Sequence, residues 1–435
     1  MNLDGYFEDA AQPHGVEEAS FSDMALGMAS SRILVIAYAV RARIEAGADV
    51  ANFTVGDFKP SQFQIPGRMQ QHIVDALVDN QTNYPPAHGT PELRAALRQH
   101  YKDSLGLEYP ESAFIVGSGA RPILYAAYRC LLNPGEVVLT PAPSWNNKNF
   151  CHLVGARHIN VPTQAADGFM PTADALRPYI KDARLLVLCS PMNPAGTMMT
   201  VDGMREITDL IVAENQRRLQ TGSRLLYVIY DQVYRMLTFG DNQHVTPVQV
   251  APEMARYTLF TDAVSKGFAG TGLRVGWLCG PPFIAARIKA LMTHMGAWAP
   301  RPEQIGTAAF LLEKDAIADY LRNFKLGIRD RLDRLYGAFS AWKKDGLPID
   351  VIPPQGAIYL SVRFDLEGRP GLPDEDAVLT YLLEKAGCAV VPFSAFGDTT
   401  NKGWVRFSVG AVSVAEIDAC LPRLRTALEN ALIPS

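Results

Sequence analysis

Short apolar runs alternate with helical stretches between about residues 60 and 300, and this alternation constrains the fold more than any other feature of the chain. Each run is bounded by turn residues and is almost wholly apolar, as expected of a strand buried on both faces of a sheet. Strands that alternate with helices, such as TPELRAALRQHYKDSL (90–105), favour a mostly parallel sheet covered on both faces. We therefore predict an α/β fold whose strands include EVVLTP (136–141), RLLVLCSP (184–191), RLLYVIYD (224–231), RYTLFTD (256–262) and RVGWLCG (274–280).

The pattern changes in the last third of the chain. A long amphipathic stretch from about Glu303 to Lys344 leads to three short apolar runs, AIYLSV, CAVVPF and WVRFSV, beside a C-terminal helix. At 435 residues the chain is long enough for two domains. We predict a large domain over residues 61–310 and a smaller α+β domain over residues 311–435, with residues 1–60 belonging largely to the smaller domain. Since the sequence contains no Pro/Gly/Ser-rich linker, we expect the two domains to pack closely.

Composition excludes several classes of partner. The net charge of -4 gives no electrostatic case for binding nucleic acid or an anionic membrane. The acidic start lacks the basic and apolar regions of a secretory signal, and no apolar run approaches the roughly 18 residues that span a bilayer. The six cysteines are scattered, without a C-x-x-C pair or a zinc spacing. We expect a cytoplasmic protein with reduced thiols and no metal site.

Polar side chains follow two of the predicted strands, at the edge of the sheet where ligands collect. Asn193 lies in the tight turn after RLLVLCSP, and Asp231, with Tyr234 three residues later, follows LLYVIY. A carboxylate that leaves a buried strand needs a cationic partner, because desolvation favours its neutral form. A protonated pyridine nitrogen would be such a partner. The alternative is that Asp231 caps a following helix.

The next predicted strand, RYTLFTD, is followed by Ser265, Lys266, a glycine-rich loop and Arg274. The amine of a lysine can form a Schiff base with an aldehyde, and the guanidinium fork of an arginine suits a phosphate. The small residues of the loop would let the backbone approach a ligand closely. The alternative for Lys266 is an ordinary solvated side chain on the surface.

Two further loops fit the same ligand. Gly119 and Ala120 open the predicted helix PILYAAYRCLL, whose N-terminal amides suit a phosphate. Trp145, in the loop after EVVLTPA, offers an indole face on which a planar ring can stack. Taken alone, the first loop is a common strand-to-helix connection and the tryptophan a common core residue. Together with the lysine, the acid and the arginine, these groups are what a phosphorylated pyridine aldehyde requires.

At this point the chain resembles the class I aminotransferases of PLP fold type I, over nearly its whole length. The motifs that carry the resemblance are N-P-x-G at residues 193–196, D-x-x-Y at 231–234 and S-K-x7-R at 265–274, in this order. Residues 31–60 resemble the N-terminal helix of the family and its glycine-containing turn at Gly56. One position departs, since Ala263 replaces the first serine of the S-x-S-K found in many relatives. This departure removes a phosphate hydroxyl and puts the tightness of cofactor binding in question.

The resemblance implies that pyridoxal 5'-phosphate (PLP) is the cofactor, that Lys266 forms the Schiff base and transfers the substrate proton, and that Asp231 holds the ring nitrogen protonated. Arg406 would clamp the substrate α-carboxylate, with Gly56 and Asn193 beside it. The resemblance also implies that Asn193 and Tyr234 hydrogen-bond the ring oxygen of PLP and that Trp145 stacks on the ring face. The phosphate would be bound by Gly119, Ala120, Ser265, Arg274 and, from the second subunit of a homodimer, Tyr84.

The implied reaction is a ping-pong transamination between an amino acid and a 2-oxo acid. In the aspartate and prephenate branch of the family, a lysine directly after the phosphate-binding glycines meets the distal carboxylate, and Arg121 stands at that position here. Arg32 is a second candidate for the distal carboxylate. We therefore expect aspartate or glutamate as donor and 2-oxoglutarate as acceptor. The alternatives are an aminotransferase for aromatic or other neutral amino acids, a PLP-dependent lyase or decarboxylase of the same fold, and a ligand-sensing regulator.

Overall fold

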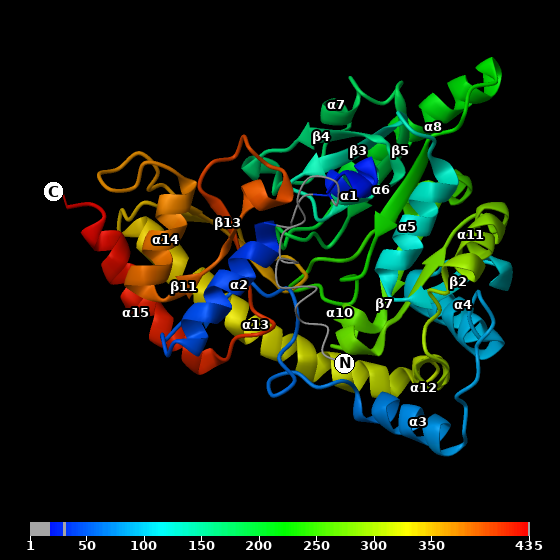
Figure 1. The fold of residues 1–435 in the computed structure, drawn as a ribbon, viewed down its shortest axis with the longest axis horizontal. Helices are drawn as coiled ribbons and strands as arrows, with labels where there is room; N and C mark the ends of the chain where they lie inside the picture. The colour runs from blue at the N-terminus through cyan, green and yellow to red at the C-terminus, as the bar shows by residue number, and fades with distance from the viewer. Residues whose placement is uncertain (1–17, 29–31, 434–435) are drawn as a thin grey trace.

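The computed structural model describes residues 18–28 and 32–433, and its centre is one large sheet (Figure 1). In the described part of the chain seven strands form this sheet, in the order β2-β8-β7-β6-β5-β3-β4. Within it β8 runs antiparallel to its neighbours β2 and β7, and the remaining pairs are parallel. The strands are β2 (Phe114–Ser118), β3 (Val137–Ala142), β4 (Arg157–Pro162), β5 (Ala183–Cys189), β6 (Tyr227–Asp231), β7 (Thr258–Ala263) and β8 (Val275–Cys279).

Helices cover the two faces of this sheet. Tyr101 of α4 (Pro91–Leu105) packs edge-on against Phe114 of β2, with ring centroids 5.3 Å apart. Ile123 of α5 (Ala120–Leu131) lies against Gly117 of the same strand. Since Phe114 and Gly117 are three residues apart, they face opposite sides of the strand. The predicted mostly parallel α/β sheet with helices on both faces is therefore confirmed.

A smaller group of elements lies beside the main sheet. The strands β12 (Val391–Pro392), β13 (Trp404–Ser408), β10 (Tyr359–Phe364) and β9 (Ile349–Val351) form an antiparallel sheet in that order. A short parallel pair joins β1 (Ala51–Asn52) to β11 (Cys388–Ala389). Helices α2 (Arg32–Glu45), α14 (Glu375–Ala386) and α15 (Val414–Asn430) accompany them. The three short runs predicted near the C-terminus are thus strands of an α+β unit.

The amphipathic stretch expected from about Glu303 to Lys344 is two helices, α12 (Arg301–Leu311) and α13 (Lys314–Lys344). The two helices are separated at Glu313, whose backbone leaves the helical region, and the carboxylate of Glu313 pairs with Arg68 at 2.5 Å. Early in α13, Ile317 packs into the core of the main sheet, whereas Phe324 packs into the core of the smaller unit. The predicted domain boundaries near residues 60 and 310 stay predictions.

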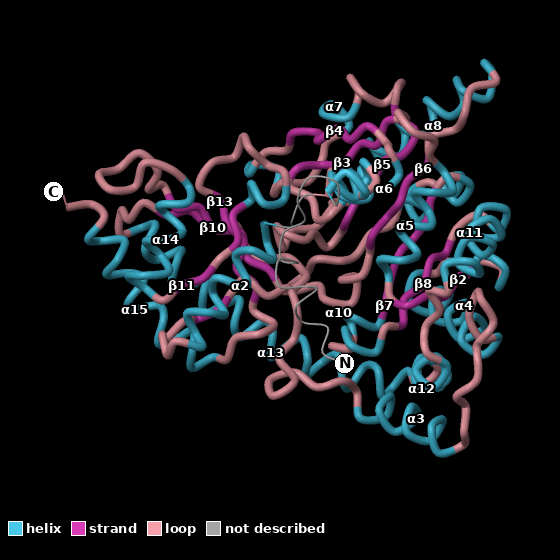
Figure 2. The backbone as a smooth tube through the Cα atoms, in the orientation of Figure 1, coloured by secondary structure: helices cyan, strands magenta, loops and turns pink. Residues whose placement is uncertain are grey.

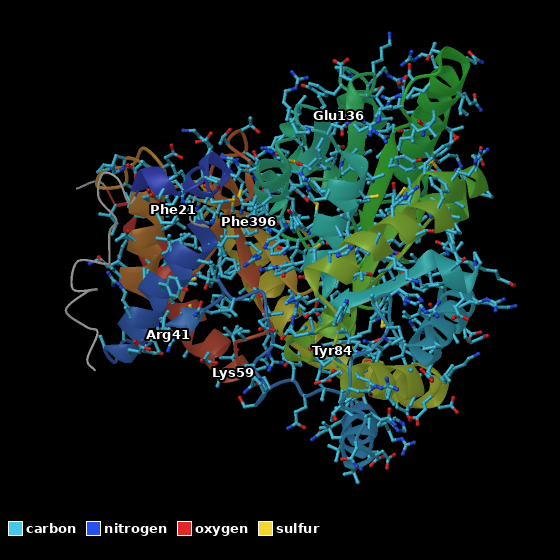
Figure 3. All side chains as sticks on the ribbon, turned by 45° about the vertical axis from the view of Figure 1, so that its right-hand side comes forward. Phe21, Arg41, Lys59, Tyr84, Glu136 and Phe396 are labelled. Atoms are coloured by element: carbon cyan, nitrogen blue, oxygen red, sulfur yellow. The ribbon has the colours of Figure 1, made fainter. Side chains whose placement is uncertain are left out.

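Loops of the two units meet between the sheets, whose strands are well separated in Figure 2. The backbone N–H of Ser144 donates to the carbonyl of Phe396, which lies between the two units, at 2.8 Å (Figure 3). No helix within residues 18–28 and 32–433 is long and apolar enough to cross a membrane. The other α-helices are α1 (Asp23–Leu26), α3 (Gly67–Val78), α6 (Asn147–Val154), α7 (Ala173–Leu176), α8 (Val201–Thr221), α9 (Pro247–Val250), α10 (Val264–Gly267) and α11 (Pro282–Met295).

Candidate active site

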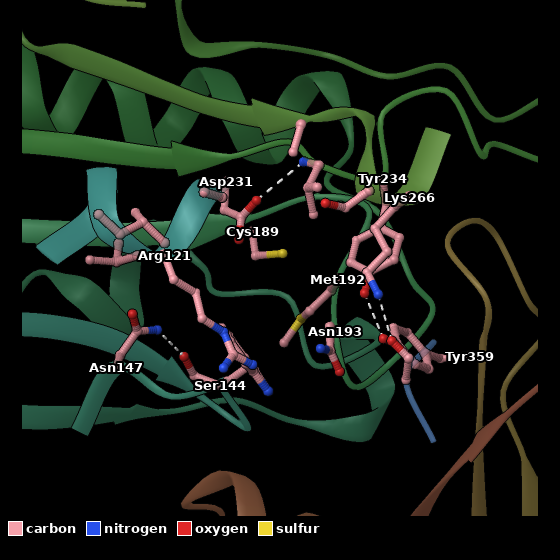
Figure 4. Close-up of a pocket in the computed structure, with 18 of the residues that line it drawn as sticks. Arg121, Ser144, Asn147, Cys189, Met192, Asn193, Asp231, Tyr234, Lys266 and Tyr359 are labelled. Carbon is pink, nitrogen blue, oxygen red and sulfur yellow. Dashed lines mark hydrogen bonds between the residues drawn. The ribbon is translucent and has the colours of Figure 1, made fainter. Parts of the chain in front are cut away.

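A pocket of about 560 Å³ opens at the carboxyl ends of β3, β5, β6 and β7, against the loops of the smaller unit. Figure 4 shows Lys266, Tyr234, Asn193 and Tyr359 gathered at one side of it, and Arg121 at another. This placement follows from the topology, because parallel strands bring their carboxyl ends to one edge of a sheet. The residues predicted from the sequence that line the pocket are Gly56, Ala120, Arg121, Trp145, Asn193, Asp231, Tyr234, Ser265, Lys266, Arg274 and Arg406.

Asp231 is the last residue of β6, and its carboxylate faces the pocket. Its pKa is raised to about 6, chiefly by burial and in smaller part by Asp262 on the next strand, whereas the N–H of Val233, which donates to Oδ1 at 3.1 Å, opposes the shift. The residues directly after β6, all described, form turns rather than a helix. The alternative that Asp231 caps a following helix is therefore wrong.

Lys266 lies in the one-turn helix α10, directly after β7. Its Nζ donates to the carbonyl of Gly56 at 2.5 Å and lies 5.8 Å from the ring centroid of Phe58. Burial lowers the pKa of the amine to about 8 against the opposing effect of Asp57, and nearby arginines, among them Arg406, lower it too. The structure thus places Lys266 in the pocket wall and not on the outer surface.

The opposite end of the pocket is a cradle at the N-terminus of α5. Gly119 has a positive φ of 80°, and a Cβ there would collide with the guanidinium of Arg274. Arg274 donates to the carbonyls of Thr271 at 2.6 Å and Ser118 at 3.1 Å. No side chain of the described residues caps α5, so its first amides are available to an anion. These backbone donors and the adjacent cation fit a phosphate.

On the side of the smaller unit, Arg406 of β13 is a buried cation. Its Nη1 donates to Oδ1 of Asn193 at 3.0 Å and its Nη2 to the carbonyl of Thr54 at 2.7 Å. Its Nε finds no partner among the described residues. Within the described part of the chain Arg406 forms no ion pair, and a buried guanidinium with an unused donor suits an anionic ligand.

Tyr359, the first residue of β10, is a pocket residue that the sequence analysis missed. Its hydroxyl lies 2.5 Å from that of Tyr234, and its ring centroid lies 4.8 Å from Cζ of Arg406. Cys189, at the end of β5 and the register partner of Asp231, was also missed. Both stand in apolar runs that are read as core strands, and the sequence carries no signal that sets them apart.

Three of the predicted site residues, Arg121, Tyr84 and Arg32, contact other side chains of the protein. The guanidinium of Arg121 lies over the indole of Trp145, with Cζ 4.4 Å from the ring centroid. Tyr84 is 83% exposed, lies outside the pocket lining, and packs edge-on against Trp298 at 5.4 Å. Nη1 of Arg32 donates to Oγ of Ser394 at 2.7 Å and forms an ion pair with Oε1 of Glu375 at 3.0 Å.

The donor set suits an organic cofactor. The residues that the structure describes include no cluster of His, Cys, Asp and Glu able to hold a metal ion. The pocket instead combines an anion cradle, an amine with a lowered pKa, a buried carboxylate and an indole face. Fold and pocket together define an α/β enzyme suited to a phosphorylated aromatic aldehyde.

The chain belongs to the aminotransferase class I and II family, whose model matches residues 48–424. It is 31% identical to the probable aspartate/prephenate aminotransferase of Rhizobium leguminosarum bv. phaseoli, over 81% of this chain and 85% of that protein. It is 29% identical to the aspartate aminotransferase of Rhizobium meliloti (strain 1021), over 95% and 98% of the two chains. The solved Thermus thermophilus aspartate aminotransferase with maleate is similar too, with a TM-score of 0.84 and 25% identity, covering 94% of this chain and all of that one.

Membership makes this protein a PLP-dependent transaminase of fold type I. The cradle of Gly119 and Arg274 fits the phosphate of this cofactor, and the amine of Lys266 fits its aldehyde. The predictions of the family, the fold, the cofactor and the reaction class are thereby confirmed.

Proposed function

We propose that this transaminase acts on dicarboxylic amino acids, taking the amino group from aspartate or glutamate and passing it to a 2-oxo acid such as 2-oxoglutarate. The observation that carries the proposal is that Arg406 and Arg121 line the same pocket as Lys266, in addition to Arg274 in the cradle. One guanidinium would take the α-carboxylate and the other the distal carboxylate. The names of the curated relatives and of the maleate complex favour the same substrate class.

Each residue of the pocket has a part in this proposal. PLP, when bound, supplies an electron sink for the substrate Cα. Lys266 would bond to its aldehyde carbon and carry the Cα proton, and a pKa near 8 leaves part of the amine neutral at physiological pH. Asp231 would face the ring nitrogen as a carboxylate. Asn193 keeps its amide N–H groups for the ring oxygen, because its Oδ1 already accepts from Arg406.

The remaining contacts complete the cofactor site. Ser265 and the first amides of α5, at Gly119 and Ala120, would bind the phosphate together with Arg274. Tyr234 would bond the ring oxygen while Tyr359 holds its hydroxyl, Trp145 would stack on the ring, and Gly56 leaves space beside the substrate. Ala263 caps α10 only through its backbone and brings no hydroxyl.

The proposal also includes a cytoplasmic homodimer. Tyr84 would reach the phosphate of the neighbouring subunit, because its side chain is 83% exposed and lies outside the pocket of its own chain. All six cysteines, each in the described part of the chain, are free thiols, which suits a reducing compartment.

The test compares kcat/KM for aspartate and for phenylalanine in wild type and in Arg121→Ala. Loss of a charge-assisted hydrogen bond should cost aspartate about 1.5 to 3 kcal/mol, roughly a tenfold to hundredfold fall, and leave phenylalanine nearly unchanged. Arg32→Ala is the control, because that guanidinium is engaged by Glu375 outside the pocket lining. An equal fall for both substrates would place Arg121 on the cofactor and favour neutral amino acids, as in the similar aromatic aminotransferase of Pyrococcus horikoshii OT3 (TM-score 0.79, 26% identity, covering 90% of this chain and 99% of that one).

A further inference from the structure

A buried ion pair lies behind the pocket, on the far face of the main sheet. Nε of Arg235 donates to Oδ2 of Asp262 at 2.7 Å, and both side chains are only 4% exposed. Thr261 is the register partner of Asp231, and consecutive residues of a strand face opposite sides. Asp262 therefore projects away from the pocket, and none of the proposed cofactor or substrate contacts uses this pair.

The ion pair joins the segment that follows Asp231 to the segment that precedes Lys266. Arg235 directly follows Tyr234 in the turn after β6, and Asp262 stands next to the end of β7, just before Ala263 and α10. Oδ1 of Asp262 accepts the N–H of Ala263 at 2.7 Å. No side chain in the described residues caps α10, so this bond helps to fix the backbone at the start of the helix that holds Lys266.

Helix α4 holds the arginine from the other side. Nη2 of Arg235 donates to Nε2 of His100 at 2.5 Å, and Nη1 donates to Oγ of Ser104 at 3.1 Å. Burial and the charge of Arg235 lower the pKa of His100 to about 3, so the imidazole is neutral and can accept. The guanidinium is thus locked by three partners on two elements.

The charges of these groups bear on Asp231. Asp231 and Asp262 are carboxylates on adjacent strands, burial raises the pKa of each, and Asp262 adds to the shift of Asp231. The negative charge of Asp262 disfavours the carboxylate form of Asp231 unless a cation offsets it. Asp231, Asp262 and Arg235 also have other titratable neighbours. Asp231 lies near Cys189 and Lys266, Asp262 lies near Tyr101, and Arg235 lies near His100 and His244. Arg235 is the cation in direct contact with Asp262.

We propose that the Arg235–Asp262 pair is a positioning element of the transaminase: it fastens the Asp231 turn to the Lys266 helix and lets Asp231 stay ionised opposite the cofactor. This inference rests on the proposed roles of Asp231 and Lys266 and is independent of the substrate. It separates into a charge effect and a fastening effect, and each has its own measurement on the holoenzyme.

The charge effect is tested with Asp262→Asn, which keeps the acceptor for the Ala263 N–H. Loss of the negative charge of Asp262 leaves Arg235 uncompensated, so both the carboxylate form of Asp231 and the deprotonated form of the bound cofactor and Lys266 are favoured. The pH midpoint of the visible absorbance of bound PLP should fall by about 0.5 to 1 unit. In the double variant Arg235→Met with Asp262→Asn both charges are gone, and the midpoint should return close to that of wild type.

The fastening effect is tested by the dissociation constant of PLP, measured by titrating apoprotein. The double variant should bind PLP about tenfold more weakly although its midpoint is restored, by analogy with outer partners of liganding groups at metal sites. Arg235→Lys keeps the charge and loses the fork; it should keep the midpoint and also bind PLP more weakly. If Asp262→Asn fails to fold, Arg235→Lys still tests the fastening effect, and an unchanged PLP affinity in this variant overturns the inference.

The matched control is Glu214→Gln, which breaks another buried pair, Glu214 with Arg218 at 2.5 Å and 5% exposed on each side, within helix α8. It should lower the melting temperature and leave the midpoint unchanged. If Asp262→Asn behaves like Glu214→Gln, the pair is merely structural and the inference is wrong. Asp231→Asn separates the two proposals: without a midpoint shift in that variant, the role of Asp231 itself is wrong, whereas a shift there but none in Asp262→Asn overturns only the positioning role.

Discussion

Lys266 and Asp231 have pKa values that burial moves toward each other, to about 8 for the amine and about 6 for the carboxyl group. Desolvation disfavours the charged form of both, which raises the pKa of an acid and lowers that of a base. Between these two values the carboxylate is mostly charged while a useful fraction of the amine is neutral. The chain thus holds a base and an anion in one pocket near neutral pH.

Lys266 should react with PLP at a lower pH than an ordinary lysine. Because the neutral amine is the nucleophile, the rate of cofactor incorporation into apoprotein should rise with pH and level off above about pH 8, instead of rising toward about 10.5. Stopped-flow absorbance measures this rate, and Lys266→Ala, which should lose nearly all turnover, identifies the amine responsible. A rate in wild type that keeps climbing to pH 10 would contradict the lowered pKa.

Asp231→Asn should keep the fold and lose the chemistry. The amide fills the same space but carries no charge to hold a proton on the ring nitrogen, so turnover should fall by several orders of magnitude, of the order seen when preorganised charges are removed from active sites. The melting temperature should be nearly unchanged, because burial already opposes the charge of the carboxylate. A loss of less than about tenfold, in single-turnover kinetics, would argue against this role.

At the scale of elements, the cofactor cradle depends on how closely β8 approaches the start of α5. A Cβ added at Gly276 would lie 2.5 Å from the carbonyl carbon of Gly119 and 2.6 Å from the nitrogen of Ala120. These are backbone atoms, so relief requires a shift of the helix terminus and of its free amides. The position of a glycine in one strand therefore sets the geometry of an anion site in another element.

Gly276→Ala should weaken PLP binding by at least about tenfold, with overpacking costing roughly 1 to 3 kcal/mol of stability. Isothermal titration of apoprotein with PLP and thermal unfolding measure the two effects. The control is Gly337→Ala in α13, where an added Cβ meets no described atom within 4 Å. Unchanged PLP affinity in Gly276→Ala would show that the cradle tolerates movement of α5.

The sequence predicts these elements well and the contacts between them poorly. Apolar runs with polar groups at their ends were enough to predict that Lys266, Asp231 and Arg274 line one pocket, because parallel strands bring those ends together. The reversed direction of β8 leaves no mark in its composition, and the ion pair of Glu313 with Arg68 joins residues that lie far apart in the sequence. The same holds for the Arg235–Asp262 pair, the partners of Tyr359 and the stacking of Arg121 on Trp145, since packing alone creates them.

At the scale of the whole molecule, the site should be complete only in a dimer. Tyr84→Ala should leave the visible spectrum of the bound cofactor in place and weaken PLP binding in both subunits, since each tyrosine would serve its neighbour. Sedimentation should find a homodimer at assay concentration, and Tyr38→Ala, which removes another exposed tyrosine on α2, is the control. A fully active monomer would refute composite sites.

Helix α13 has a consequence for how the whole chain melts. With 31 residues it is about 46 Å long at 1.5 Å per residue, and it begins in the core of the main sheet and continues through the core of the smaller unit. Neither core can lose its packing without stripping apolar partners from a helix that the other core also needs. The two units are therefore expected to behave thermodynamically as one cooperative block, so that heat or denaturant removes both in a single step and no half-folded species retains one of them.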